Sequence, residues 1–168
     1  MSVHSPNGVP SGGTYLAVSL YLILKFLHVL LAIIAIGFNA SYPIWLSRAQ
    51  RDPEHALYVL RGIKILDDRF ANPAYALLLV LGLAMTFMAG IPFSTFWIAA
   101  ALALYVLLIG GGIFVYSPTL KGQIRALETV GHASPEYTRL SQRGTLVGIL
   151  LAVDVVIIVF LMVVKPTL

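Results

Sequence analysis

From Phe70 to Leu120 the chain carries no charged residue, and this stretch limits the folds open to it more than any other feature. A membrane-spanning helix needs about 20 apolar residues, so the stretch is too long for one helix and long enough for two. Gly90, Ile91 and Pro92 interrupt it, and glycine close to proline is typical of a turn. We therefore predict one span over about 73–89 and another over about 94–116, the second ending at Ser117-Pro118.

Two further apolar runs complete a set of four spans. The first covers about 16–46, and the last covers about 144–164 with Asp154 as its only charged residue. With 59% hydrophobic and 11% charged residues, the chain does not have the composition of a soluble domain. We predict an all-α fold, a four-helix transmembrane bundle with short interfacial helices in the two polar loops. Residues 15–168 form its single membrane domain, and residues 1–14 a disordered tail.

The charges predict the orientation of this bundle. Most lysines and arginines lie in two polar loops, 47–72 and 121–143, whereas the turn between the second and third spans has none. The positive-inside rule places both loops in the cytoplasm and both termini outside it. The net charge of +4 therefore reports topology, with the lipid bilayer as partner and no nucleic acid.

The first span presents a polar stripe that includes the candidate ligand His28. Residues at helical spacing along one face are small or polar, whereas the opposite face is Leu, Ile and Phe, so the stripe is expected to face protein. The stripe consists of Lys25, His28, Ala32, Ala35, Asn39 and Tyr42. His28 either donates a hydrogen bond to a neighbouring helix or ligates haem or copper. Met85 and Met88 lie at a similar depth and are the candidate thioether partners.

Asp154 is the second candidate, because a carboxylate within a span costs at least ~2.5 kcal/mol. It is either a proton relay or cation partner, or a neutral acid that donates to a neighbouring backbone or hydroxyl. Gly144, Gly148 and Ala152 form a ridge of small residues on another face of the same helix. One of these faces can pack within the bundle and the other against a partner, in a homo-oligomer or a larger membrane complex, although both can also be internal.

Known motifs of soluble enzymes are absent. There is no cysteine, which excludes disulfides and thiolate metal sites, and no GxxxxGK[ST], HExxH or GxSxG. No catalytic residue is predicted.

Two segments carry a resemblance to a family. The run from Leu24 to Leu30 with Ala32 and Gly37, and Asn72-Pro73-Ala74 followed by 79–83, resemble the first two helices of a bacterial membrane superfamily. It includes the four-helix protoporphyrinogen oxidases of the HemJ type, the copper-resistance CopD membrane domain and an uncharacterised family of predicted integral membrane proteins. The resemblance implies a multi-pass protein of the bacterial inner membrane, with His28 matching a histidine implicated in binding haem b. The third-helix lysine of the oxidases has no counterpart in 96–101, and the match is closest to the uncharacterised family.

Three functions follow from these observations. The leading hypothesis is a non-catalytic or accessory component of a membrane assembly. The alternatives are a haem-b-dependent oxidoreductase with His28 as axial ligand, and copper handling at the outer face through His28 and the methionines.

Overall fold

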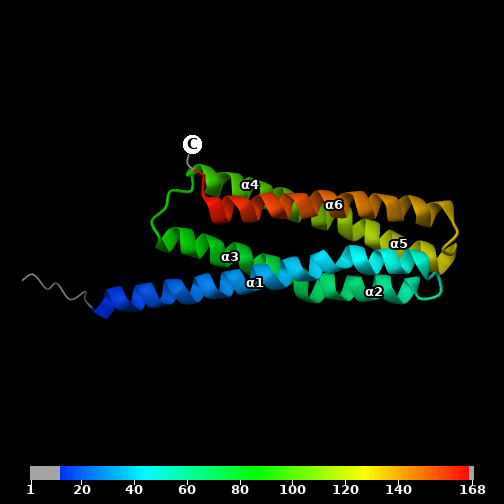
Figure 1. The fold of residues 1–168 in the computed structure, drawn as a ribbon, viewed down its shortest axis with the longest axis horizontal. Coiled ribbons are helices and arrows are strands. Elements are labelled where there is room, and N and C mark those ends of the chain that lie inside the picture. Colours follow the sequence, from blue (N-terminus) through cyan, green and yellow to red (C-terminus); the bar gives the residue numbers. More distant parts are fainter. Residues whose placement is uncertain (1–11, 167–168) are drawn as a thin grey trace, which may run out of the picture.

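A computed structural model describes residues 12–166, all of its regular elements being helices (Figure 1). Within these residues, four helices are long and apolar enough to cross a membrane. The predicted all-α, four-span bundle is thus confirmed. Most of the predicted tail, 1–14, lies outside the described residues. The elements in order are α1 (Gly12–Arg51), α2 (Ala56–Leu66), η1 (Asp67–Ala71), α3 (Asn72–Met88), α4 (Phe96–Gly111), η2 (Gly112–Tyr116), α5 (Ser117–Thr129) and α6 (Pro135–Val164).

The two middle helices run without a break through their prolines. α2, η1 and α3 form one helix, and α4, η2 and α5 form another. η1 and η2 are single π-helical turns, each followed closely by a proline, Pro73 or Pro118. The residue before each proline donates its N–H to the fifth residue back, Asn72 to Asp67 and Ser117 to Gly112. A helix can therefore continue past a residue that has no N–H to donate, because the widened turn relieves the proline ring's clash with the preceding turn.

This arrangement changes the detail of the prediction at Ser117-Pro118. The dipeptide does not end its helix, which continues to Thr129. The short helix expected in the first polar loop is α2, whereas in the second loop the expected start at Pro135 is the beginning of α6 itself. α2 and α5 are each joined directly to a longer apolar helix. Just before α2, whose first residue is Ala56, the Asp52 carboxylate accepts the backbone N–H of His55 at 3.3 Å.

One end of the bundle, which we call the closed end, contains α2 and α5 packed with the adjoining parts of α1 and α6 (Figure 1). Side chains from all four helices meet in one apolar core there, because α2 and α5 each carry an apolar face opposite a charged one. An exposed ion pair, Arg61 to Glu128 at 2.7 Å, joins α2 to α5. The core consists of Tyr42, Leu60, Ile63, Tyr116, Leu120, Ala126 and Tyr137.

The other end, which we call the open end, consists of two separate helix pairs (Figure 1). α3 packs on α1 to form a first arm, and α4 packs on α6 to form a second. Within the described residues, the backbone of α3 does not come close to that of α4 or α6. A shallow apolar groove remains between α3 and α4, lined by Leu79, Tyr105, Val106, Ile109, Gly110 and Phe114.

The ridge of small residues on α6 packs inside the chain. A Cβ added to Gly144 would come within 2.5 Å of the Gln123 amide nitrogen, which itself donates to the carbonyl of Leu140 at 3.2 Å. Gly148 lies against the Tyr116 ring. These glycines therefore permit the close approach of α6 to η2 and α5, whereas Ala152 is exposed.

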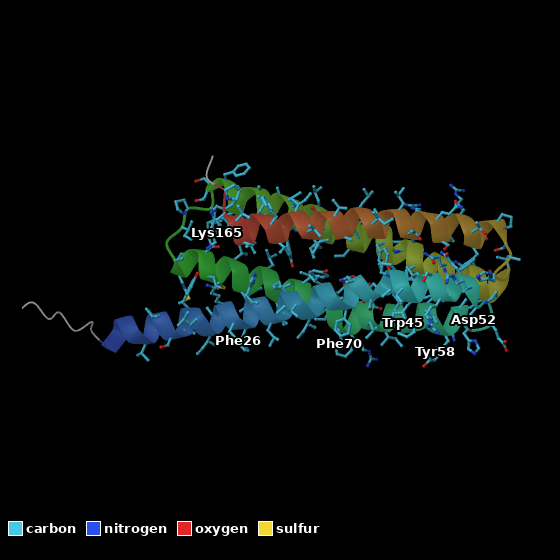
Figure 2. The ribbon with its side chains drawn as sticks, in the orientation of Figure 1. Phe26, Trp45, Asp52, Tyr58, Phe70 and Lys165 are labelled. Atoms are coloured by element: carbon cyan, nitrogen blue, oxygen red, sulfur yellow. The ribbon has the colours of Figure 1, made fainter. Side chains whose placement is uncertain are left out.

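The outer surface of the long helices is apolar. Figure 2 shows Phe26 and Phe70 directed away from the bundle, and their exposed fractions are 65% and 52%. At the open end, the Lys165 ammonium lies 5.3 Å from the centre of the Trp97 ring, a cation–π contact between α6 and α4. Such a surface is stable in hydrocarbon, which agrees with four membrane spans.

Candidate functional site

A cluster of polar side chains lies where the two arms diverge, and we call it the tyrosine cluster. The Asn39 amide of α1 donates to the Tyr75 hydroxyl of α3 at 2.7 Å and to the carbonyl of Ala35 at 3.0 Å. The Tyr105 hydroxyl of α4 donates to the backbone carbonyl of Tyr75. These bonds link three of the long helices, and the last one bridges the two arms. The cluster consists of Asn39, Tyr42, Asp67, Tyr75, Tyr105 and Tyr116.

Asp67 is the acidic member of the cluster. Its residue is only 8% exposed, and it lies within electrostatic range of the hydroxyls of Tyr42, Tyr75 and Tyr116. The nearby Lys64 ammonium donates to Asp68, so two carboxyl groups share one ammonium. A buried carboxyl is costly unless it is paired or hydrogen-bonded, and the Asn72 side chain lies close enough to Asp67 to donate to it.

The two π-helical turns place the cluster. η1 carries Asp67, and η2 ends at Tyr116, which is 9% exposed. A π-helical turn adds one residue to the helix and so rotates the next stretch about its axis. Such turns are a known cause of bends in helices. The turns therefore mark the level at which the closed end gives way to the separate arms.

The Tyr42 hydroxyl is a fully buried polar group of the cluster. The residue is 3% exposed, and its oxygen has no hydrogen-bond partner among the described residues. An unpaired buried hydroxyl costs about 1–3 kcal/mol. The hydrogen bonds of the cluster therefore join the helices, while the buried Tyr42 hydroxyl has no partner among the described residues.

His28 lies against α3, with the nitrogen-bearing edge of its ring toward that helix. Its Cε1 atom, between the two ring nitrogens, is 3.2 Å from the position of a Cβ on Gly82, and the ring also lies beside the backbone of Leu78. Its Nδ1 is buried without a partner in the described part of the chain. The role of His28 as a haem or copper ligand stays a prediction.

The two candidate methionines both lie on α3. Met85 is half-buried on α3, one helical turn from Gly82, and Met88 borders a shallow hollow with Tyr21 and Leu22 of α1. Across residues 12–166, no three histidine or acidic side chains gather into a group able to hold a metal ion. His4 lies outside that range.

Asp154 is half-buried in the second arm. Its Oδ2 atom is buried and has no hydrogen-bond partner among the described residues, neither the expected backbone nor hydroxyl group. It lies one turn from Leu151, whose methyl group contacts Gly111 of α4.

Sequence reasoning identified Asn39 and Tyr42 but missed Asp67, Tyr75 and Tyr105. Asp67 was assigned to a polar loop because it stands beside Asp68 and Arg69 in the sequence. A usable signal was present, because Ala56, Leu60, Ile63 and Asp67 recur at helical spacing on the buried face of α2 and η1.

Comparison with known proteins places the chain in a family. A family model described as "Predicted integral membrane protein (DUF2269)" matches residues 22–166. No curated protein matches the chain, and no solved structure does.

Proposed function

The chain belongs to the family of predicted integral membrane proteins DUF2269, and from that premise we propose that it is a non-catalytic component of an assembly in the bacterial inner membrane. In this proposal the two arms receive a transmembrane helix of a partner subunit in the groove between α3 and α4.

The separation of the arms is the observation that carries this proposal. The groove between them is apolar, and Tyr105 is its one polar contributor. Helices associate in lipid through close packing and interhelical hydrogen bonds, and not through the hydrophobic effect. The groove offers both, because Gly110 lies in its wall, and the Tyr105 hydroxyl, which donates to the Tyr75 carbonyl, can still accept a hydrogen bond.

Photo-crosslinking in native membranes tests the proposal. A photoreactive amino acid at Leu79 or Ile109, both in the groove, is expected to give a protein adduct of defined mass. The same group at Leu77 or Leu107, which are 51% and 66% exposed on other sides of α3 and α4, is the matched control. Adducts of twice the chain's mass would make a second copy the occupant. Groove positions that give no protein adduct would contradict the proposal.

The proposed orientation has both termini outside the cytoplasm, because the closed end carries most of the lysines and arginines. A periplasm-dependent reporter fused after Leu168 should then be active, and one fused near His132 should be silent. The opposite pattern would invert the orientation.

The haem and copper alternatives make His28 a ligand, and its Nδ1 is a buried nitrogen without a partner among the described residues. An absorbance spectrum and metal analysis of the protein purified in detergent check this point. A Soret band would favour the oxidoreductase, and stoichiometric copper without haem would favour copper handling.

A further inference from the structure

Four cations line the outer face of the α5–α6 pair at the closed end, and we propose that they bind the phosphate groups of anionic phospholipids. We call them the basic quartet: Lys121, Arg125, Arg139 and Arg143. All four are exposed.

The packing of α5 against α6 sets the register of the quartet. Gly122 faces Leu140, and Gly144 faces Thr119 and Gln123, so the helices are antiparallel neighbours with a fixed alignment. This alignment places Lys121 level with Arg143, and Arg125 level with Arg139. Each helix contributes residues four apart, so the two levels are separated by ~6 Å along the axis.

The neighbouring contacts place the quartet on one face. On α5, Gln123 faces α6 and Leu120 faces the core shared with α2. On α6, Leu140 faces α5, and Ser141 accepts a hydrogen bond from Gln50 of α1. α1 and α2 therefore cover one side of the α5–α6 pair. The quartet occupies the other side on both helices.

The quartet lies where the apolar parts of both helices end. Lys121 directly follows the uncharged stretch that ends at Leu120, and Arg143 directly precedes the last apolar run. The polar layer of a bilayer is about 5–8 Å thick on each side, which matches the separation of the two levels. Phosphate oxygens therefore lie at the depth of these side chains when the helices span the membrane.

The charge of the quartet is not neutralised within the described chain. Arg61 pairs with Glu128 and Lys64 with Asp68, whereas no ion pair involves a member of the quartet. Glu136 is the nearest acid on α6 and lies one turn closer to the connecting loop. Juxtamembrane lysines and arginines are attracted to anionic lipid by about 1 kcal/mol each, and arginine binds phosphate in a bidentate manner.

Lipid retention and melting of the purified full chain test this proposal. Native mass spectrometry should show phosphatidylglycerol retained over phosphatidylcholine, and phosphatidylglycerol in mixed micelles should raise the melting temperature. The Arg125→Gln/Arg139→Gln variant should lose at least half of both effects. The matched control is Arg61→Gln/Lys64→Gln, which also removes two cations but from existing ion pairs, and it should keep both effects.

Several outcomes would overturn the proposal. If wild type and the Arg125→Gln/Arg139→Gln variant retained phosphatidylglycerol equally, the quartet would not be the binding site. If the control variant lost as much retention as this variant, the effect would depend only on net charge. Inorganic phosphate alone, if it gave the same melting shift, would make the ligand a soluble anion and not a membrane lipid. An Arg125→Lys/Arg139→Lys variant, which keeps the charge, should retain the preference. If this lysine variant had normal helicity but lost the preference for phosphatidylglycerol, that result would also contradict the proposal.

Discussion

The closed end and the open end are built from the same long helices, yet they are held together in different ways. At the closed end, Leu60 of α2 and Leu120 of α5 are 0% and 1% exposed. They lie in a core to which all four helices contribute side chains. At the open end, burial is divided between the arms, with Ala35, Ala74 and Leu78 forming a cluster in the first arm and Ile98, Ala101 and Leu108 buried in the second. The difference shows that amphipathic segments make a self-contained bundle, whereas uniformly apolar segments pair only where small residues permit close contact.

The difference between the two ends follows from the solvent that surrounds each of them. A helix with a charged face gains free energy by turning its apolar face inward, because water surrounds the other side. In hydrocarbon an apolar side chain gains little by leaving lipid for protein, so packing and hydrogen bonds decide. The Tyr105-to-Tyr75 bond then matters more at the open end than its small free energy indicates, because it joins the two arms.

The largest expected effect is on the core of the closed end. Leu60→Ala should lower the free energy of unfolding by about 2–5 kcal/mol, since Leu60 is fully buried and its removal leaves a cavity. Leu78→Ala in the first arm should cost less, because its transfer from lipid to protein contributes little. Unfolding of both variants in mixed micelles, followed by circular dichroism, measures the difference. Leu77→Ala, at a 51% exposed position, is the control and should change stability by less than ~0.5 kcal/mol. Equal losses for Leu60→Ala and Leu78→Ala would break the comparison.

The next largest effect is expected at Gly144, where α6 packs closely on α5. Gly144→Ala should cost about 1–3 kcal/mol, because the added Cβ would displace the Gln123 amide from its bond to Leu140. Gly37→Ala on α1 is a matched control, since a Cβ there meets nothing within 4 Å. It should be neutral or stabilising, by up to ~1 kcal/mol from helix propensity. Similar destabilisation by both substitutions would show that the α5–α6 contact is looser than described.

A smaller energetic effect, but a large structural one, is expected at the bridge between the arms. Tyr105→Phe removes the hydroxyl that donates to the Tyr75 carbonyl and should cost about 0.6 kcal/mol, the average for such bonds in a membrane. The distance between spin labels on Val80→Cys and Leu107→Cys should become broader, which pulsed electron paramagnetic resonance measures. The chain has no cysteine of its own, so labelling is specific.

Tyr58→Phe is the control for this experiment, because Tyr58 is 81% exposed on α2. An unchanged distance distribution in Tyr105→Phe would mean that packing alone, and not this hydrogen bond, sets the distance between the arms.

The sequence predicted the parts of the fold that depend on local chemistry. The uncharged stretch and Gly90, whose φ is +63°, predicted the two middle helices and the turn between them. The polar stripe of the first span predicted that Ala35 and Tyr42 would be buried, at 0% and 3% exposure. Both signals are readable because helical spacing and glycine's access to positive φ hold in any surroundings.

The parts that were not predicted depend on long-range geometry. Prolines at 73 and 118 were treated as helix boundaries, because the alternative of a π-helical turn is rare. That choice placed Asp67 in a loop and hid its position beside Tyr42 and Tyr116. The separation of the arms could not be predicted either, since it depends on how two continuous helices bend at η1 and η2.

The smallest expected effect is electrostatic and lies in the exposed connection between α1 and α2, at the closed end (Figure 2). The Asp52 carboxylate lies 2.9 Å from the His55 Nδ1, which raises the pKa of His55 above 6.5 and lowers the pKa of Asp52 below 3.8. A raised histidine pKa contributes stability that is present below 6.5 and is lost as the pH rises through the folded-state value. A lowered aspartate pKa contributes stability that is present above 3.8 and is lost as the pH falls through its folded-state value. Both contributions are therefore present between pH 3.8 and 6.5.

Nuclear magnetic resonance titration of the His55 ring in micelles checks this expectation, with His55→Gln used to assign the signal. Asp52→Asn is the sharpest variant, because an amide oxygen can still accept the His55 backbone N–H while the negative charge is removed. The His55 midpoint should then return toward 6.5, and the melting temperature should lose its slight decrease as the pH rises above 6.5 through the raised His55 pKa. An unchanged midpoint in Asp52→Asn would show that the pair is open in solution. The closed end would then owe its integrity to the apolar core and not to its surface charges, since exposed ion pairs contribute little in any case.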